Sequence, residues 1–153
     1  MLNAISLRIV VTAMLFLTTS VAVAQDATVP INTKSGTLGN PEPGKAQIVF
    51  FRPGSMMGAA LGCTVHEGDA ELARLGSGKY YVISATPGKH EYFTEGEVTD
   101  KLPLEVEDDE TYFVKCKIGM GVMSGRANIS PSDRATFAEK AKGLTMWQPK
   151  PKK

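Results

Sequence analysis

The fold is decided by seven consecutive residues, Ala46-Gln47-Ile48-Val49-Phe50-Phe51-Arg52, which end directly before Pro53-Gly54. β-Branched and aromatic side chains dominate this run and favour a β-strand, whereas Pro-Gly ends one. The run is almost continuously hydrophobic instead of alternating between apolar and polar residues. We therefore expect this strand to occupy a central position in its sheet.

Six more segments downstream are expected to be strands, because they carry strand-type residues and turn signals separate them. The turn signals include Glu67-Gly68-Asp69, Gly76-Ser77-Gly78, Pro87-Gly88 and an acidic turn at residues 107–110. About seven short strands predict an all-β, mainly antiparallel fold: a small β-sandwich, with a small open barrel as the alternative. The six segments are residues 61–66, 71–75, 79–84, 90–95, 102–106 and 112–118.

One C-terminal helix is expected after the strands. Ser130 is predicted to cap it, Pro131 to take its first position, and Asp133 to lie near the positive end of the helix dipole. Apolar residues then recur at helical spacing, and Gly143 follows Lys142. The helix should therefore end near Lys142.

The N-terminus has the pattern of a secretory signal peptide over residues 1–24. Arg8 supplies the positive charge, residues 9–17 form a predominantly apolar run, and Ala22-Val23-Ala24 is a cleavage site of the A-x-A type. The alternative is an uncleaved anchor, although a spanning helix needs roughly 20 apolar residues. The pattern predicts an exported protein, periplasmic or extracellular, with no stable membrane span after cleavage.

The exported chain divides by composition into three parts. Residues 25–44 are expected to be a flexible leader, residues 45–143 the β-sandwich domain with its terminal helix, and residues 144–153 a basic disordered tail. Only Arg8 is charged within residues 1–24, so the exported chain carries equal numbers of basic and acidic side chains. This balance argues against nucleic acid as a partner.

Cys63 and Cys116 are the only two cysteines. Alternation places each on the inward face of its expected strand, and export would keep a disulfide oxidised. We therefore expect a Cys63–Cys116 disulfide, which would stabilise the fold by roughly 4 kcal/mol. Two buried free thiols remain the alternative.

Five segments together carry a family resemblance: Gly44-Lys45-Ala46-Gln47-Ile48-Val49-Phe50-Phe51-Arg52-Pro53, Gly78-Lys79-Tyr80-Tyr81, Thr86-Pro87-Gly88-Lys89-His90, Thr111-Tyr112-Phe113-Val114 and Gly125-Arg126. In these segments the chain resembles the bacterial DUF2846 family, over residues 44–142. The resemblance implies a β-sandwich-like exported domain with no assigned activity, and it supplies no catalytic residues to carry over.

Two aromatic pairs, Tyr80-Tyr81 and Tyr92-Phe93, are the candidate binding residues. Alternation directs one ring of each pair inward and the other outward, unless both sheet faces are covered. Outward rings would form a platform for a sugar or a peptide. The structural alternative is that these rings are cross-strand pairs that stabilise a sheet.

The remaining chemistry-bearing residues form no expected catalytic set. His66 and His90 stand beside Glu67 and Glu91, but adjacent strand residues point to opposite faces. The methionines at 56, 57, 120 and 123 are expected to fill core gaps; an adaptable binding surface or a copper site are the alternatives. We expect no cofactor and no metal.

These observations favour a non-catalytic structural or protein-interaction module of the cell envelope, with an envelope protein as its partner. The alternative is a carbohydrate- or peptidoglycan-binding domain that holds wall polymer with its outward aromatics. A small hydrolase is the third class.

Overall fold

The computed structural model describes residues 29–121 and 125–149, and in these ranges the protein is a β-sandwich with one helix. The larger sheet contains β3 (Ala46–Arg52), β6 (Lys79–Ala85), β9 (Thr111–Met120), β10 (Gly125–Ser132) and β11 (Thr145–Met146), in the order β10-β9-β3-β6-β11. The smaller sheet contains β4 (Cys63–Glu67), β5 (Ala70–Leu75), β7 (Gly88–Thr94) and β8 (Asp100–Val106), in the order β5-β4-β7-β8.

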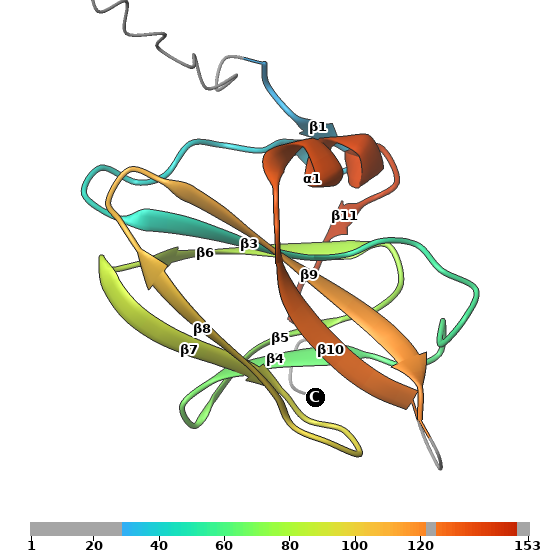
Figure 1. The fold of residues 1–153 in the computed structure, drawn as a ribbon. Coiled ribbons are helices and arrows are strands. Elements are labelled where there is room, and N and C mark those ends of the chain that lie inside the picture. Colours follow the sequence, from blue (N-terminus) through green and yellow to red (C-terminus); the bar gives the residue numbers. More distant parts are fainter. Residues whose placement is uncertain (1–28, 122–124, 150–153) are drawn as a thin grey trace, which may run out of the picture.

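The outer face of the larger sheet carries a third layer. It consists of α1 (Arg134–Ala141) and a two-stranded sheet of β1 (Asn32–Thr33) and β2 (Gly36–Thr37). Figure 1 shows α1 and β1 together on one side of the larger sheet, with the four-stranded sheet on its other side. The larger sheet is therefore covered on both faces.

The strand that the sequence predicts to be central, β3, lies in the middle of the larger sheet. β3 pairs with β6 in antiparallel fashion, Ile48 opposite Ile83, and with β9 in parallel fashion, Ile48 opposite Tyr112. All seven residues of β3 are buried. Its continuous hydrophobicity follows from this position, because one set of alternate side chains enters the core between the sheets and the other enters the core beneath α1.

The core between the two sheets contains the disulfide. Cys63 on β4 and Cys116 on β9 are bonded, with Cα atoms 6.5 Å apart, and both side chains are buried. The bond therefore connects the two sheets, which confirms both the pairing and the inward direction of the two residues. Phe50 and Tyr92 also meet across the sheets, in an edge-to-face contact with ring centroids 5.1 Å apart.

The core beneath α1 is built around Phe137. This ring contacts Phe51, Tyr80 and Phe113 of the larger sheet, with centroid distances of 5.2, 5.8 and 5.2 Å. Ile31, from the segment before β1, is buried in the same cluster. From residue 29 onward the expected flexible leader is therefore wrong, because Ile31 and Leu38 pack into this hydrophobic cluster.

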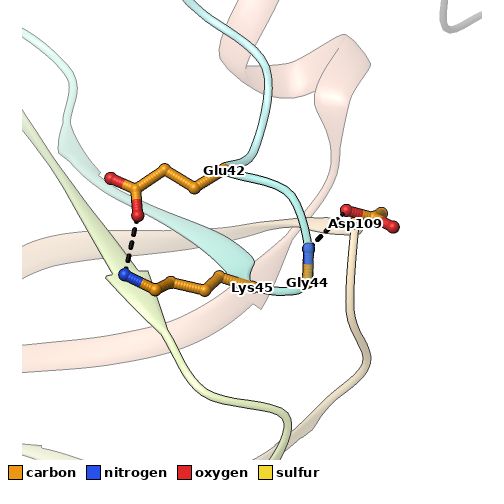
Figure 2. A network of polar contacts seen from close by, with 4 residues as sticks. All are labelled: Glu42, Gly44, Lys45 and Asp109. Atoms are coloured by element: carbon orange, nitrogen blue, oxygen red, sulfur yellow. Dashed lines mark hydrogen bonds and ion pairs between the residues drawn. The ribbon is translucent and has the colours of Figure 1, made fainter.

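The start of β3 is connected to the turn between β8 and β9 by polar contacts (Figure 2). The backbone amide of Gly44 donates to Asp109 Oδ1 at 3.0 Å, and the Asp109 amide donates to the Lys45 carbonyl at 3.0 Å. The Lys45 ammonium pairs with Glu42 at 2.7 Å on the surface. Asp109 has a positive φ of 58°, so the expected acidic turn is also a specific backbone turn that sets the parallel register of β3 and β9.

The helix begins later than the sequence predicts. Ser130 and Pro131 belong to β10, where Pro131 lies opposite Val114, and the N-cap is Asp133, whose carboxylate accepts from the Thr136 amide at 2.7 Å. Pro131 is tolerated there because β10 is an edge strand of its sheet. The predicted helix end is confirmed, since Lys142 is the C-cap.

The expected disordered tail over residues 144–153 is also wrong at its start. Leu144 is fully buried beneath α1, and β11 pairs in parallel with Lys79 and Tyr80 of β6. The count of about seven strands is too low for the same reason: the seven expected strands are all present, whereas β1, β2, β10 and β11 escape prediction because they are short or contain proline and polar residues.

The predicted signal peptide at residues 1–24 lies outside the described residues, as do positions 150–153 of the tail. Among the residues that are described, no helix is long and apolar enough to cross a membrane.

Candidate binding groove

The two long sides of the sandwich differ. On the side of β8 and β10, the sheets are joined by hydrogen bonds: the Ile129 amide donates to Asp100 Oδ2 at 2.8 Å, and the Thr94 hydroxyl donates to the Ala127 carbonyl at 3.1 Å. On the other side, β5 is the edge of the smaller sheet, and β11 covers only the first two residues of β6. This second side is therefore the open one.

A groove of about 770 Å³ lies on this open side. Its lining comes from three places: the segment that leads from β3 to β4, the edge strand β5 with the turn that follows, and the chain around β11. The lining residues are Ala59, Ala60, Leu61, Gly62, Glu71, Arg74, Gly76, Lys79, Met146, Trp147 and Gln148.

One wall of the groove is held by the buried side chain of Arg52, the last residue of β3. Its guanidinium donates to the carbonyl oxygens of Gly58 at 2.6 Å and Leu75 at 3.3 Å, and also to that of Leu61. Burial lowers the pKa of this guanidinium, yet an arginine stays charged in proteins. These bonds hold residues 58–61 against the end of the sandwich although the segment has no regular secondary structure.

Small residues let this wall pack closely. Gly58 has a positive φ of 64°, and a Cβ there would lie 2.7 Å from Cγ2 of Ile118. A Cβ on Gly62 would lie 2.6 Å from Nε of Arg74, so the Arg74 side chain lies directly over Gly62. Glycine is therefore required at Gly58, by its backbone conformation and by the contact with buried Ile118, whereas at Gly62 the exposed Arg74 side chain could move aside.

The opposite wall is built by Trp147 and its neighbours. The Trp147 amide donates to the Tyr80 carbonyl at 2.7 Å, and its indole makes an edge-to-face contact with Tyr81, centroids 5.2 Å apart. The Lys79 ammonium donates to the Thr145 hydroxyl at 2.8 Å. Trp147 is half-buried and covers part of the open side of the inner core.

The charges of the groove are unequal. Arg74 and Lys79 supply two cations, and Glu71 supplies one carboxylate. The apolar contribution comes from Leu61, Met146 and the Trp147 ring. The groove therefore offers a mixed apolar and cationic surface. Sequence reasoning missed it because its walls come from segments about 90 positions apart that meet only after folding.

The structure does not bring the four candidate aromatics together on one surface. Tyr80 and Tyr92 are buried, with exposed fractions of 1% and 0%, so neither ring can contribute to a binding platform on the surface. Tyr81 is half-buried beside Trp147, and Phe93 is half-buried on the smaller sheet, stacked on His66 at 5.1 Å. The two rings of each pair lie on opposite faces of their sheet, as alternation predicts. At Tyr80-Tyr81 both faces are covered, because Tyr80 lies in the core beneath α1 and Tyr81 packs against the core between the sheets.

His90 is engaged on both ring nitrogens. Nδ1 lies 2.5 Å from Glu67 Oε1, and Nε2 lies 2.8 Å from the Thr86 carbonyl oxygen. A carbonyl oxygen only accepts, so Nε2 donates to it, and the second proton is shared between Nδ1 and Glu67. Both nitrogens are therefore occupied.

Two opposing effects act on His90. Burial by itself would lower its pKa, but the hydrogen bonds to Glu67 and Thr86 and the charge of Glu67 outweigh burial, so the pKa is raised above its ordinary value. The partner is a cross-strand carboxylate and not the neighbouring Glu91, which pairs with Lys101 at 2.8 Å. Strand register alone brings Glu67 opposite Tyr92, two residues from His90 on the same face.

The methionines are surface residues. Met56, Met57 and Met120 are exposed, at 97%, 58% and 83%, so core filling is wrong for these three, and Met123 lies outside the described residues. Within residues 29–121 and 125–149, no group of three or more His, Cys, Asp and Glu side chains is placed to hold a metal ion.

Comparison with known proteins returns one match. The model of a family described as "Protein of unknown function (DUF2846)" matches residues 42–128, from just before β3 to the middle of β10. No curated protein and no solved structure matches the chain. The groove lies partly outside the matched range, because Met146, Trp147 and Gln148 follow it.

Proposed function

This chain belongs to the DUF2846 family of proteins of unknown function, and from its geometry we propose that it is a non-catalytic protein-interaction module of the cell envelope. The groove on the open side is the observation that carries this proposal. A buried arginine holds one wall in place, an aromatic residue forms the other, and two cations lie between them. Pre-formed, mainly apolar concave sites with a few polar groups are typical binding sites.

Two further features support the proposal. The inter-sheet disulfide fits an oxidising compartment, and with the signal-peptide pattern it supports export to the periplasm or beyond the cell. His90, the histidine with a close carboxylate partner, has both ring nitrogens engaged by Glu67 and Thr86. Neither nitrogen is free to transfer a proton to a substrate, which favours a binding function over a catalytic one.

Affinity capture tests the function. The disulfide-intact exported chain is immobilised and exposed to envelope extract, alongside Trp147→Ala in the groove and Lys101→Ala on the exposed surface of β8 as the matched control. We expect a protein that wild type and the Lys101 variant retain and the Trp147 variant loses. If no protein is retained above background by wild type, the proposed function is wrong.

Wall polymer is the second candidate ligand, because Trp147 and Tyr81 still provide two neighbouring aromatic rings at the open side. Aromatic faces are suited to sugar rings. Co-sedimentation with purified wall polymer tests this candidate. Pelleting that Trp147→Ala abolishes would support it, whereas no pelleting of wild type would remove it.

A further inference from the structure

We propose that the groove binds an extended peptide segment that carries acidic side chains, with Arg74 and Lys79 bonding its carboxylates and Trp147 covering an apolar side chain. This inference rests on the proposed function and names the chemistry of its partner. Three features of the groove carry it: an edge strand on one rim, two cations in the lining, and an apolar surface beside them.

The β5 rim of the groove favours an extended chain. β5 is an edge strand with a hydrogen-bonded neighbour on one side only, and its residues Glu71 and Arg74 line the groove. Backbone groups at a strand edge are ready to pair with another extended chain, and adding a strand is a common mode of peptide recognition. On the other side of the sandwich, the edge strands β8 and β10 are joined to each other through Asp100.

One of the two cations is held before any ligand arrives. The Lys79 ammonium is anchored on the Thr145 hydroxyl, whereas Arg74 is an exposed side chain that lies over Gly62. Side chains that are already placed lose less conformational freedom on binding. Because one carboxylate, that of Glu71, accompanies the two cations, the groove attracts negative charge.

The apolar part completes the site. Leu61 is 41% exposed and Met146 36% exposed, and Trp147 is half-buried between groove and core. Aromatic residues, methionine and arginine are the side chains enriched in protein interfaces. In an extended peptide, successive side chains point to opposite sides, so alternating acidic and apolar residues would meet the cations on one side and this apolar surface on the other.

Trp147 is the only tryptophan in the chain, so its fluorescence reports directly on the groove. The probe is acetyl-Glu-Val-Glu-Val-Glu-Val-amide, titrated into the disulfide-intact exported chain to about 1 mM, the weak end of specific affinities. The same peptide with lysine in place of glutamate and an acidic oligosaccharide, oligogalacturonate, are titrated in parallel. Far-UV circular dichroism of each variant checks that it is folded.

We expect the glutamate peptide to shift the Trp147 emission saturably and the lysine peptide to leave it unchanged. Arg74→Ala should weaken binding by about tenfold, as for the loss of one charge-assisted hydrogen bond, and Lys79→Ala should weaken it in the same direction. Lys101→Ala, which removes a surface cation on β8, should bind like wild type.

Each of the other possible outcomes would show that one defined part of the proposal is wrong. If no peptide shifts the emission while Trp147-dependent capture of an envelope protein persists, the acidic-peptide assignment is wrong and the proposed function stands. If oligogalacturonate binds and the glutamate peptide does not, the groove is a glycan site. Peptide binding that both cation variants leave unchanged overturns the role of Arg74 and Lys79. Peptide binding without any captured protein overturns the proposed function alone.

Discussion

The guanidinium of Arg52 donates a hydrogen bond of 2.6 Å to the carbonyl oxygen of Gly58, six positions further along the chain. The same guanidinium also bonds the carbonyls of Leu61 and Leu75, so one buried side chain satisfies three backbone groups from two segments. The last residue of the central strand thereby shapes the groove on the open side of the sandwich. This relationship yields the first prediction.

Arg52→Met keeps the length of the side chain and removes its donors. Three carbonyls then lose their partner, so we expect the free energy of unfolding to fall by about 2–4 kcal/mol. Hydrogen exchange should become faster at residues 55–62, and denaturant unfolding with exchange mass spectrometry measures both effects. Arg74→Met is the control, because its exposed side chain should change stability by less than about 0.5 kcal/mol. Unchanged exchange in the Arg52 variant would contradict the role of Arg52 as an anchor.

The Cys63–Cys116 bond connects residues 53 positions apart, so it restricts the unfolded chain strongly. Replacing both cysteines with alanine should lower the free energy of unfolding by about 4 kcal/mol. Guanidinium denaturation of wild type and the double variant measures the difference, and reduced wild type should resemble the variant. Equal midpoints for oxidised and reduced wild type would show that the bond contributes nothing to stability.

His90 should make stability depend on pH. Its folded-state pKa is raised above the unfolded value of about 6.5, so its contribution is complete below that value and is lost as the pH rises through the folded pKa. The stability difference between wild type and His90→Gln should therefore be largest near pH 5.5 and shrink toward pH 8.5. Denaturation at several pH values measures it.

His66→Gln is the matched control for this pH series, since it removes the other histidine, which stacks on Phe93, and leaves the Glu67–His90 bond in place. A His90→Gln difference that is constant from pH 5.5 to 8.5 would rule out the Glu67–His90 bond as its source.

The N-cap of α1 is a position at which the sequence prediction and the structure differ, and mutation can test which residue caps the helix. Asp133 accepts the Thr136 amide, and this bond with that of the Thr136 hydroxyl lowers the pKa of Asp133. Asp133→Ala should therefore lower the melting temperature by a few degrees, whereas Ser130→Ala, in β10, should leave it unchanged. The Asp133 contribution should also vanish as the pH falls through its lowered pKa. A larger loss from Ser130→Ala would favour the cap predicted from sequence.

Local patterns were sufficient where one strand or one turn carries its own signal. The hydrophobicity of residues 46–52 predicted a central strand. Alternation predicted the inward direction of Cys63 and Cys116 and the placement of the Tyr80 and Tyr81 rings on opposite faces of their sheet. Such features depend on the two-residue period of a strand, which each segment displays by itself.

The groove could not be predicted in this way. Leu61, Arg74 and Trp147 lie in three separate segments, and none belongs to a motif. The tail was expected to be disordered because its composition is basic and rich in proline, yet the single buried Leu144 and the indole of Trp147 are enough to fix residues 144–147. His90 likewise has a partner on another strand instead of its sequence neighbour.

By itself, the sequence determined the all-β class, the central strand, the disulfide pair and the helix end, because each depends on periodicity or on residue chemistry within a short window. Tertiary structure alone decided which side of the sandwich is open, where the helix begins and which charges meet. Those properties depend on strand order and register, and hydrogen bonds between segments far apart in the chain settle them only when the two sheets pack.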